Sequence, residues 1–219
     1  QGGSTVREPT GFNSTPTITR APMGQRERSV MSPDDENVKV AARNIQSGLY
    51  LIGIDTYNKE DTQETAERWV KALLEFNQGP PDVAAIMKGG FIPASHPGMV
   101  VQSGIPFRAL CEHHLFPMHG TAHVGYIPEE RMTGLSKLVR IVDAFGTARP
   151  GTQEIITEEI GRAINMHLAP KGVGVVIEAA HTCIDTRGVH ATGVMTRTSF
   201  MHGVFLTEAS CRDEFLRLT

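Results

Sequence analysis

The chain has 219 residues, of which 40% are hydrophobic, 21% charged and 6% aromatic, a composition typical of a globular protein that builds its core without disulfide bonds. Its 21 Lys and Arg residues against 24 Asp and Glu residues give a net charge of −3, which argues against a general nucleic-acid-binding protein but permits a local basic pocket. No run approaches the roughly 20 apolar residues of a membrane-spanning helix, so a membrane role is not expected.

The N-terminal segment, residues 1–35, is dominated by Gly, Ser, Thr, Pro and Arg, and no apolar face recurs in it. Such a segment buries too little apolar surface to offset its ordering entropy, which predicts a disordered arm. It also lacks the basic stretch and apolar run of a signal peptide. We therefore expect a cytoplasmic protein. Its three cysteines, an odd number, then argue against a disulfide framework and favour metal binding or catalysis.

Residues 36–98 are predicted to be an N-terminal helical region. Val38 and Ile45 belong to an apolar series at helical spacing that follows a Ser/Asp start signal. A second amphipathic helix is predicted over residues 60–76, and Gly and Pro residues directly after it end the helix. Residues 82–98 are punctuated by Gly and Pro and predict no element.

Residues 99–219 have a mixed pattern that predicts an α+β domain. Two strands come first, then two amphipathic helices, then two more strands: 99–110, 120–127, 134–146, 153–167, 172–180 and 194–205. This order favours helices layered on an antiparallel sheet over alternating βαβ units. The strands are too few to close a barrel within one chain.

The densest chemical feature is Cys111-Glu112-His113-His114, followed some seventy residues later by His181-Thr182-Cys183. A Cys and a His three residues apart reach the same point when the backbone makes one turn, and Cys183 completes a set of two thiolates and one imidazole. Three protein ligands with one open position are typical of a catalytic zinc site. In strand geometry, His181 would point to the same side as Cys183. The plainer alternative is two buried thiols beside an incidental histidine pair.

The surrounding motifs favour the zinc site over this plainer alternative. They occur in one order: CEHHLFP at 111–117, GYIP at 125–128, GLSK at 134–137, QE at 153–154, HTC at 181–183 and RGV at 187–189. This combination strongly resembles the GTP cyclohydrolase I family, and the resemblance runs from about Glu60 to Leu218. It implies a tunnelling fold, an antiparallel sheet with two helices on one face preceded by N-terminal helices. It further implies subunits that assemble as a homodecamer with active sites at subunit interfaces.

The resemblance also implies roles for individual residues. Cys111, His114 and Cys183 match the zinc ligands, and His113 and His181 match the catalytic histidines. Glu154, with Gln153, matches the group that recognises the guanine edge. Ser136, Lys137, Arg140 and Arg187 match residues on the triphosphate and ribose side, with Ser136 also handling protons. Arg68 matches an arginine supplied by a neighbouring subunit, although the usual Pro beside it is Ala66 here.

These roles suit the family's reaction, the hydrolysis of GTP at C8 to formate and 7,8-dihydroneopterin triphosphate. Zinc activates water near neutral pH, and a histidine supplies the proton that the ring nitrogen needs. A carboxylate at Glu154 accepts from the N1–H and 2-amino groups of guanine, which adenine lacks. Lys137 and Arg140 lie three residues apart on a predicted helix and would hold a triphosphate on one face. Without the resemblance, the two would be read as solvated surface charges.

Two alternatives remain open. The segment 193–198 is bulkier than the family's usual Ser/Thr-rich strand and carries the added cation Arg197. A related zinc hydrolase that stops at the formamidopyrimidine, or that acts on another purine nucleotide, would accommodate such a change. The second alternative is a zinc-stabilised subunit that binds a nucleotide without turning it over.

Overall fold

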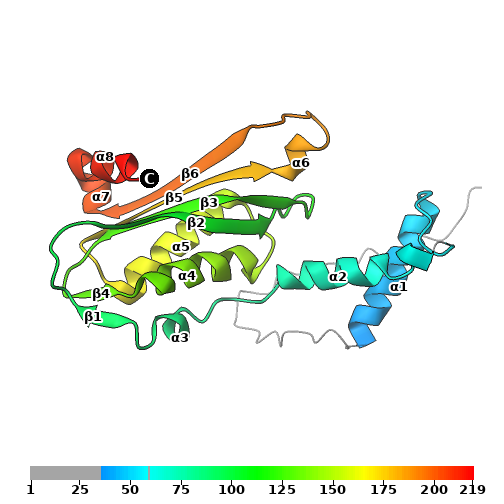
Figure 1. The fold of residues 1–219 in the computed structure, drawn as a ribbon, viewed down its shortest axis with the longest axis horizontal. Helices are drawn as coiled ribbons and strands as arrows, with labels where there is room; N and C mark the ends of the chain where they lie inside the picture. Colours follow the sequence, from blue (N-terminus) through cyan, green and yellow to red (C-terminus); the bar gives the residue numbers. More distant parts are fainter. Residues whose placement is uncertain (1–35, 59) are drawn as a thin grey trace, which may run out of the picture.

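The computed structural model describes residues 36–58 and 60–219, and the predicted arm at 1–35 lies outside the described residues. Its main body is a layered α+β domain, from which two N-terminal helices project (Figure 1). The predicted α+β class is confirmed, and the layout agrees with the tunnelling fold that the resemblance implied. Within the described residues, no helix is long and apolar enough to cross a membrane.

The central sheet is antiparallel throughout. Its order is β2-β3-β5-β6, formed by β2 (Val100–Leu110), β3 (Pro117–Ile127), β5 (Gly172–His181) and β6 (Met195–Gly203). These four strands correspond to the four predicted ones, of which the first two were predicted from alternation. In β5 the residues of both faces are largely buried, which is why its sequence reads as a continuous β-branched run rather than as an alternating one.

Helices α4 (Leu135–Ala148) and α5 (Gln153–Leu168) cover one face of the sheet (Figure 1). The core lies between them and the strands, and its fully buried members include Leu138, Ile156, Val124 and Ile177. Both helices were predicted from their apolar stripes, and each is one or two residues longer at its C-terminal end than predicted. The end of α4 and the start of α5 lie near Cys111, so these two helices help to position the candidate site.

The opposite face of the sheet is covered at one end by the C-terminus. Helices α7 (Val204–Thr207) and α8 (Ala209–Arg217) fold back over it. Phe205 and Phe215 meet edge to face, with ring centroids 5.4 Å apart, above Gly125 and Gly174. The two glycines leave the room that these rings fill, so the chain end is part of the packed fold.

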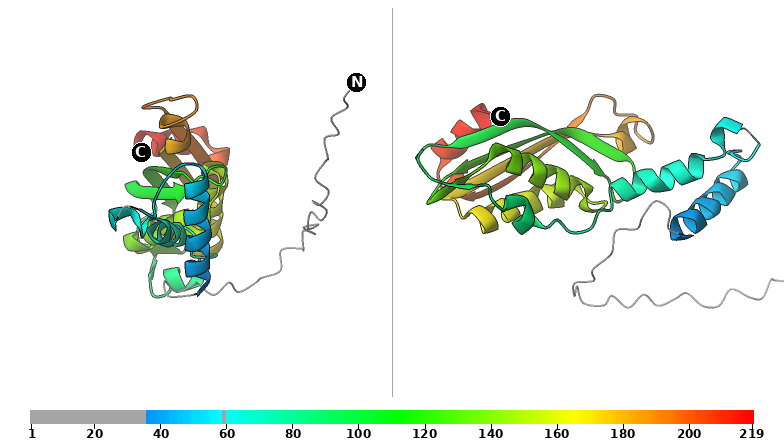
Figure 2. Two further views of the ribbon diagram at one scale, coloured as in Figure 1. Left: turned by 90° about the vertical axis from the view of Figure 1, so that its right-hand side faces the viewer. Right: turned by 60° about the horizontal axis from the view of Figure 1, so that its bottom comes forward.

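The N-terminal helices form a hairpin with its own small core. Helix α1 (Glu36–Leu51) packs on α2 (Thr65–Glu75), and Val38, Ala42, Ala66 and Val70 are buried between them. Figure 2 shows the pair standing away from the sheet. The helix predicted over 60–76 is divided, because a short 3-10 turn, η1 (Glu60–Thr62), precedes α2. The hairpin therefore reaches beyond the body of its own chain.

Residues 82–98, for which the sequence predicted no element, join the main domain. Helix α3 (Val83–Met87) begins at Asp82, whose side chain accepts from the Ala85 N–H at 2.9 Å, and it adds two buried side chains to the main core. Strand β1 (Phe91–Pro93) pairs with β4 (Arg131–Thr133) in a separate two-stranded ribbon. The division of the chain at residue 98 stays a prediction.

Candidate active site

The first wall of the site is the turn that follows β2. The Leu115 N–H donates to the Cys111 carbonyl at 2.8 Å, which closes one turn, and the Cys111 N–H donates to the Phe116 carbonyl at 3.0 Å. Leu115 adopts a positive φ of 55°, which lets the chain reverse into β3. The turn leaves Cys111 buried and both His113 and His114 exposed.

The second wall is the end of β5. The strand stops at His181, opposite Met118, and the short helix α6 (Thr182–Asp185) begins at the next residue. The Thr182 hydroxyl donates to the Pro117 carbonyl at 2.6 Å, which ties α6 to the start of β3. The sequence predicted that Cys183 would lie on the same strand face as His181. The helical turn of α6, rather than a strand, brings these two side chains together.

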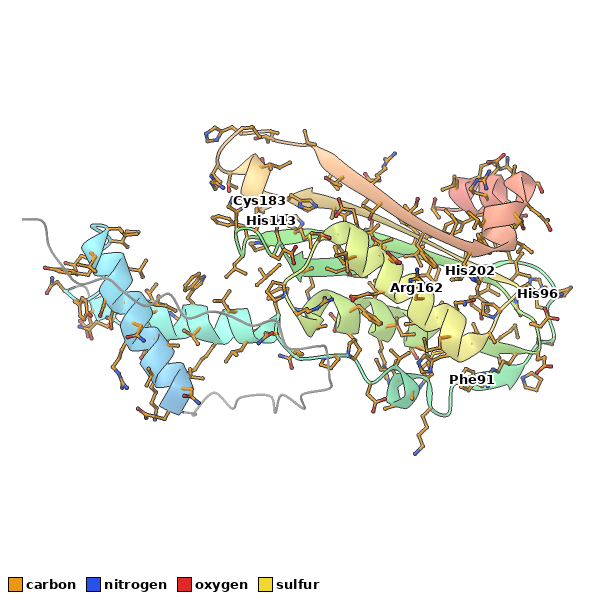
Figure 3. All side chains as sticks on the ribbon, turned by 180° about the vertical axis from the view of Figure 1, so that it is seen from behind. Phe91, His96, His113, Arg162, Cys183 and His202 are labelled. Atoms are coloured by element: carbon orange, nitrogen blue, oxygen red, sulfur yellow. The ribbon has the colours of Figure 1, made fainter. Side chains whose placement is uncertain are left out.

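Three potential metal ligands meet between these walls. One ligand atom each from Cys111, His181 and Cys183 lie within 4.8 Å of one another. Figure 3 shows Cys183 beside His113 at this end of the sheet. Donors around a tetrahedral ion with bonds of 2.0–2.3 Å stand about 3.3–3.8 Å apart, so small side-chain rotations would bring this group to bonding distance. The group could bind a metal ion.

The histidines are arranged differently from the implied roles. The group contains His181, which the resemblance made catalytic, and it omits His114, which the resemblance made a ligand. The Nδ1 atom of His113 lies 3.6 Å from the Cys111 sulfur. Burial raises the pKa of the Cys183 thiol, the neighbouring Cys111 raises it further, and the charge of Arg187 opposes both. A bound cation would reverse this by favouring the thiolates.

The start of α5 supplies the third wall. Gln153 is fully buried, and its side-chain oxygen lies 2.7 Å from Nε2 of His181. Burial lowers the pKa of His181, and the charge of the exposed Glu154 opposes this by less. The sequence missed this buried link between Gln153 and His181. It also missed Thr198, whose hydroxyl lies 3.1 Å from the Gln153 amide nitrogen; its polar type within a strand was the only available signal.

The basic residues predicted to hold the triphosphate are not all at this place. Arg187 follows α6 and is close enough to affect Cys183. Ser136, Lys137 and Arg140 instead lie in the first turns of α4, whereas the last turn of α4 leads to Gly151, which bridges to Cys111. At a rise of 1.5 Å per residue, Ser136 is about 18 Å from the end of the helix. Lys137 donates to the Lys88 carbonyl at 3.0 Å.

Arg68 is also remote from the metal-ligand group within this chain. It lies on the projecting helix α2, where its guanidinium meets the Glu64 carboxylate at 3.2 Å and the Asp61 carbonyl at 3.1 Å. Among the described residues, the chain brings seven of the predicted ones to this place: Cys111, His113, Gln153, Glu154, His181, Cys183 and Arg187. Ser136, Lys137, Arg140 and Arg68 lie on other elements, and His114 lies on the Cys111 turn but outside the metal-ligand group.

Two buried thiols and an imidazole meet around one point at the end of an antiparallel sheet, and a further histidine and a carboxylate flank them. These are features of a metal-dependent enzyme. The sequence model of GTP cyclohydrolase I matches residues 41–219. The chain belongs to the GTP cyclohydrolase I family.

Relatives in distant organisms agree with this membership. The chain is 43% identical to GTP cyclohydrolase 1 of Aquifex aeolicus strain VF5 over 86% of this chain and 98% of that protein. It is 38% identical to GTP cyclohydrolase 1 of Dictyostelium discoideum, over 88% of this chain and 83% of that protein. The corresponding protein of Saccharomyces cerevisiae is 36% identical, over 90% and 81% respectively. A solved archaeosine synthase, QueF-Like, aligns with 50% of this chain at a TM-score of 0.40 and 15% identity, a likeness too slight to bear on function.

Proposed function

We propose that this protein is a GTP cyclohydrolase I, which hydrolyses GTP to formate and 7,8-dihydroneopterin triphosphate. The observation that carries the proposal is the meeting of Cys111, Cys183 and His181 beside His113, in a chain of this family. The proposal includes a cytoplasmic location, which is supported by the free thiols of Cys111, Cys183 and Cys211.

The metal of this proposal is zinc, because two thiols and an imidazole are a donor set that zinc prefers. Cys111 and Cys183 would be two ligands. The closed turn at Cys111 supports His114 as the third, since residues three apart in such a turn lie on one face. His181 is the alternative third ligand. When bound, zinc would lower the pKa of a coordinated water to about 7.

The remaining steps belong to the chain's own residues. Glu154 accepts hydrogen bonds from the N1–H and 2-amino groups of guanine and so orients the base. As water adds at C8, His113 protonates the ring nitrogen and the imidazole ring opens to a formamide. A second water cleaves the formamide, and formate leaves. The ribose then opens, rearranges and closes on the freed amine with loss of one water, while His181 and Ser136 move the protons.

We further propose that each site is completed by a neighbouring copy of the chain within a homodecamer. The position of Ser136 supports this, because it lies near the opposite end of α4 from the metal-ligand group of its own chain. The projecting position of Arg68 supports it as well. Lys137 and Arg140 from one copy would hold the triphosphate of a GTP whose base lies against Glu154 of another.

The test is incubation of the zinc-loaded protein with GTP. We expect formate release and, after oxidation and dephosphorylation, a fluorescent pterin. Intact GTP at about one zinc per chain would contradict the proposal. Mass spectrometry also detects a product that keeps the formyl carbon. Arg197, which raised that alternative, binds Glu178 at 2.6 Å on the sheet face away from α4 and α5, which argues against a role in the chemistry.

A further inference from the structure

Gln153 has an unusual position for a residue expected to read a substrate. It is the first residue of α5, its side chain has 0% exposure, and every polar atom of that side chain has a partner within the chain. The amide nitrogen lies 3.0 Å from the Ile177 carbonyl on β5 and 3.0 Å from the Thr196 carbonyl on β6. A guanine base therefore has neither access to this amide nor a free hydrogen-bonding group to meet.

The two carbonyls determine which way the amide faces. Carbonyl oxygens only accept hydrogen bonds, so the NH2 group of Gln153 must face them and its oxygen must face His181. An amide oxygen also only accepts. The Nε2 atom of His181, 2.7 Å away, must then carry the hydrogen, which leaves Nδ1 as the unprotonated nitrogen of the neutral ring.

We propose that Gln153 is a positioning residue, which holds His181 in one orientation and one tautomer instead of recognising guanine. This inference rests on the proposed function, in which His181 handles protons. If His181 turned away, the Gln153 oxygen would be buried without a donor, so the native orientation is favoured by the penalty of an unmade buried hydrogen bond. The link also joins the end of β5 to the start of α5 at the one place where both enter the site.

A kinetic comparison separates the two roles. In Gln153→Met, which keeps the shape but not the hydrogen bonds, we expect kcat for GTP to fall about 10–100-fold, with KM and the preference for GTP over inosine triphosphate unchanged. Inosine triphosphate lacks the 2-amino group, so a residue that reads the guanine edge would change that preference. A raised KM, a lost base preference or a wild-type kcat would overturn the inference.

The matched control is Thr157→Val. Thr157 is buried in the same network, donating to the Gln153 backbone carbonyl at 2.7 Å, but it does not contact His181. We expect it to lower stability and leave kcat near the wild-type value. An equal loss of kcat in this variant would make the effect of Gln153→Met merely structural. Should the Met variant fail to assemble, Gln153→Glu keeps an oxygen opposite His181 and is expected to keep measurable turnover; no turnover in an assembled Glu variant would count against the inference.

Two further measurements test whether Gln153 acts through His181 and which tautomer His181 adopts. In a His181→Ala background, adding Gln153→Met should lower kcat little further, because the residue acts through His181; full additivity would contradict this. Nitrogen-15 NMR of histidine-labelled protein, with His181→Ala as the assignment control, should show the Nε2–H tautomer, lost in Gln153→Met. The spectrum needs no turnover, so the inference is decided even if wild-type protein leaves GTP intact and the proposed function fails.

Discussion

At the scale of single residues, neighbouring histidines on one turn have unequal surroundings. His113 approaches the Cys111 sulfur, whereas His114 is exposed outside the metal-ligand group. In the proposed function His114 binds the metal and His113 moves protons, so substitution of each histidine should remove a different property.

The first prediction compares Cys183→Ala with His113→Ala. The first variant loses a thiolate, so we expect it to lose both zinc and turnover. The second should retain about one zinc per chain and lose about 10²–10⁴-fold in the rate of GTP consumption, the effect of a missing general acid. Metal analysis beside GTP consumption checks both.

The same metal analysis identifies the third ligand. We expect His114→Ala to lose zinc and His181→Ala to keep it. The opposite pattern would assign the ligand to His181, in agreement with the grouping of its ring nitrogen with the two thiols. Zinc loss from a folded His113→Ala protein would contradict the assignment of His113 as a proton donor.

A second residue-scale prediction concerns His123 on β3. Burial lowers its pKa, and the charge of Glu178 opposes that by less. A lowered pKa in the folded state means that the unfolded chain takes up the proton first. The stability that His123 contributes is therefore present above its ordinary pKa of about 6.5 and is lost as the pH falls below it.

We expect His123→Asn to reduce the loss of stability at acid pH. In the wild-type protein the Gly104 N–H donates to His123 Nδ1 at 3.3 Å. Asn at position 123 keeps an acceptor for this N–H, but its side chain does not titrate. Urea unfolding over about pH 5–8 measures the difference. Equal pH dependence in the two proteins would show that His123 does not take part in this linkage.

At the scale of elements, the contact of α4 with β2 depends on a glycine. A Cβ on Gly146 would strike the backbone carbonyl of Arg108, which cannot move without shifting the strand. The helix can approach this closely only because no side chain intervenes, and the approach sets where α4 ends, next to Gly151 and Cys111.

We therefore expect Gly146→Ala to destabilise the protein by about 1–3 kcal/mol in spite of the better helix propensity of Ala. The control is Gly48→Ala on α1, where a Cβ meets nothing within 4 Å. That change should stabilise by up to about 1 kcal/mol. Denaturant unfolding checks both signs, and a stabilised Gly146→Ala protein would show that the strand yields.

At the scale of the whole molecule, the residues proposed for one site are spread over distant parts of a single chain. Neither of the two cavities described, of about 410 and 270 Å³, is lined by a member of the metal-ligand group. Ser136 and Lys137 lie at the other end of the domain from the metal-ligand group, and α2 projects outward. In the proposed homodecamer, a second copy would bring these cations to the metal-ligand group.

This arrangement predicts complementation between inactive chains. His113→Ala and Lys137→Ala damage different contributors to one site, so subunits mixed after unfolding and refolding together should form some sites with both groups intact. We expect turnover of GTP to exceed that of either variant alone. The control pairs His113→Ala with Glu154→Ala, which lie on the same side of the site and should not complement. Complementation in the control, or none in the test pair, would contradict a shared site.

The local pattern of the sequence predicted most of the fold. The two covering helices and the first two long strands follow from periodicity, because one face of each is buried in the main core. Strand β5 follows from its β-branched run, because the residues of both its faces are largely buried. The short elements α3, β1, β4 and α6 were missed, since three to five residues contain no periodicity and are held by their neighbours. The α+β class needed only the order of the long elements.

The site divides in the same way. The sequence alone determined which residue types carry chemistry, because the pairing of Cys111 and Cys183 with histidines is written in the two motifs. Only the tertiary structure decided that the buried Gln153 contacts His181, and that Ser136 lies near the opposite end of α4 from the metal-ligand group. The physical reason is that burial and separation depend on contacts between segments far apart in the chain, which no local spacing encodes.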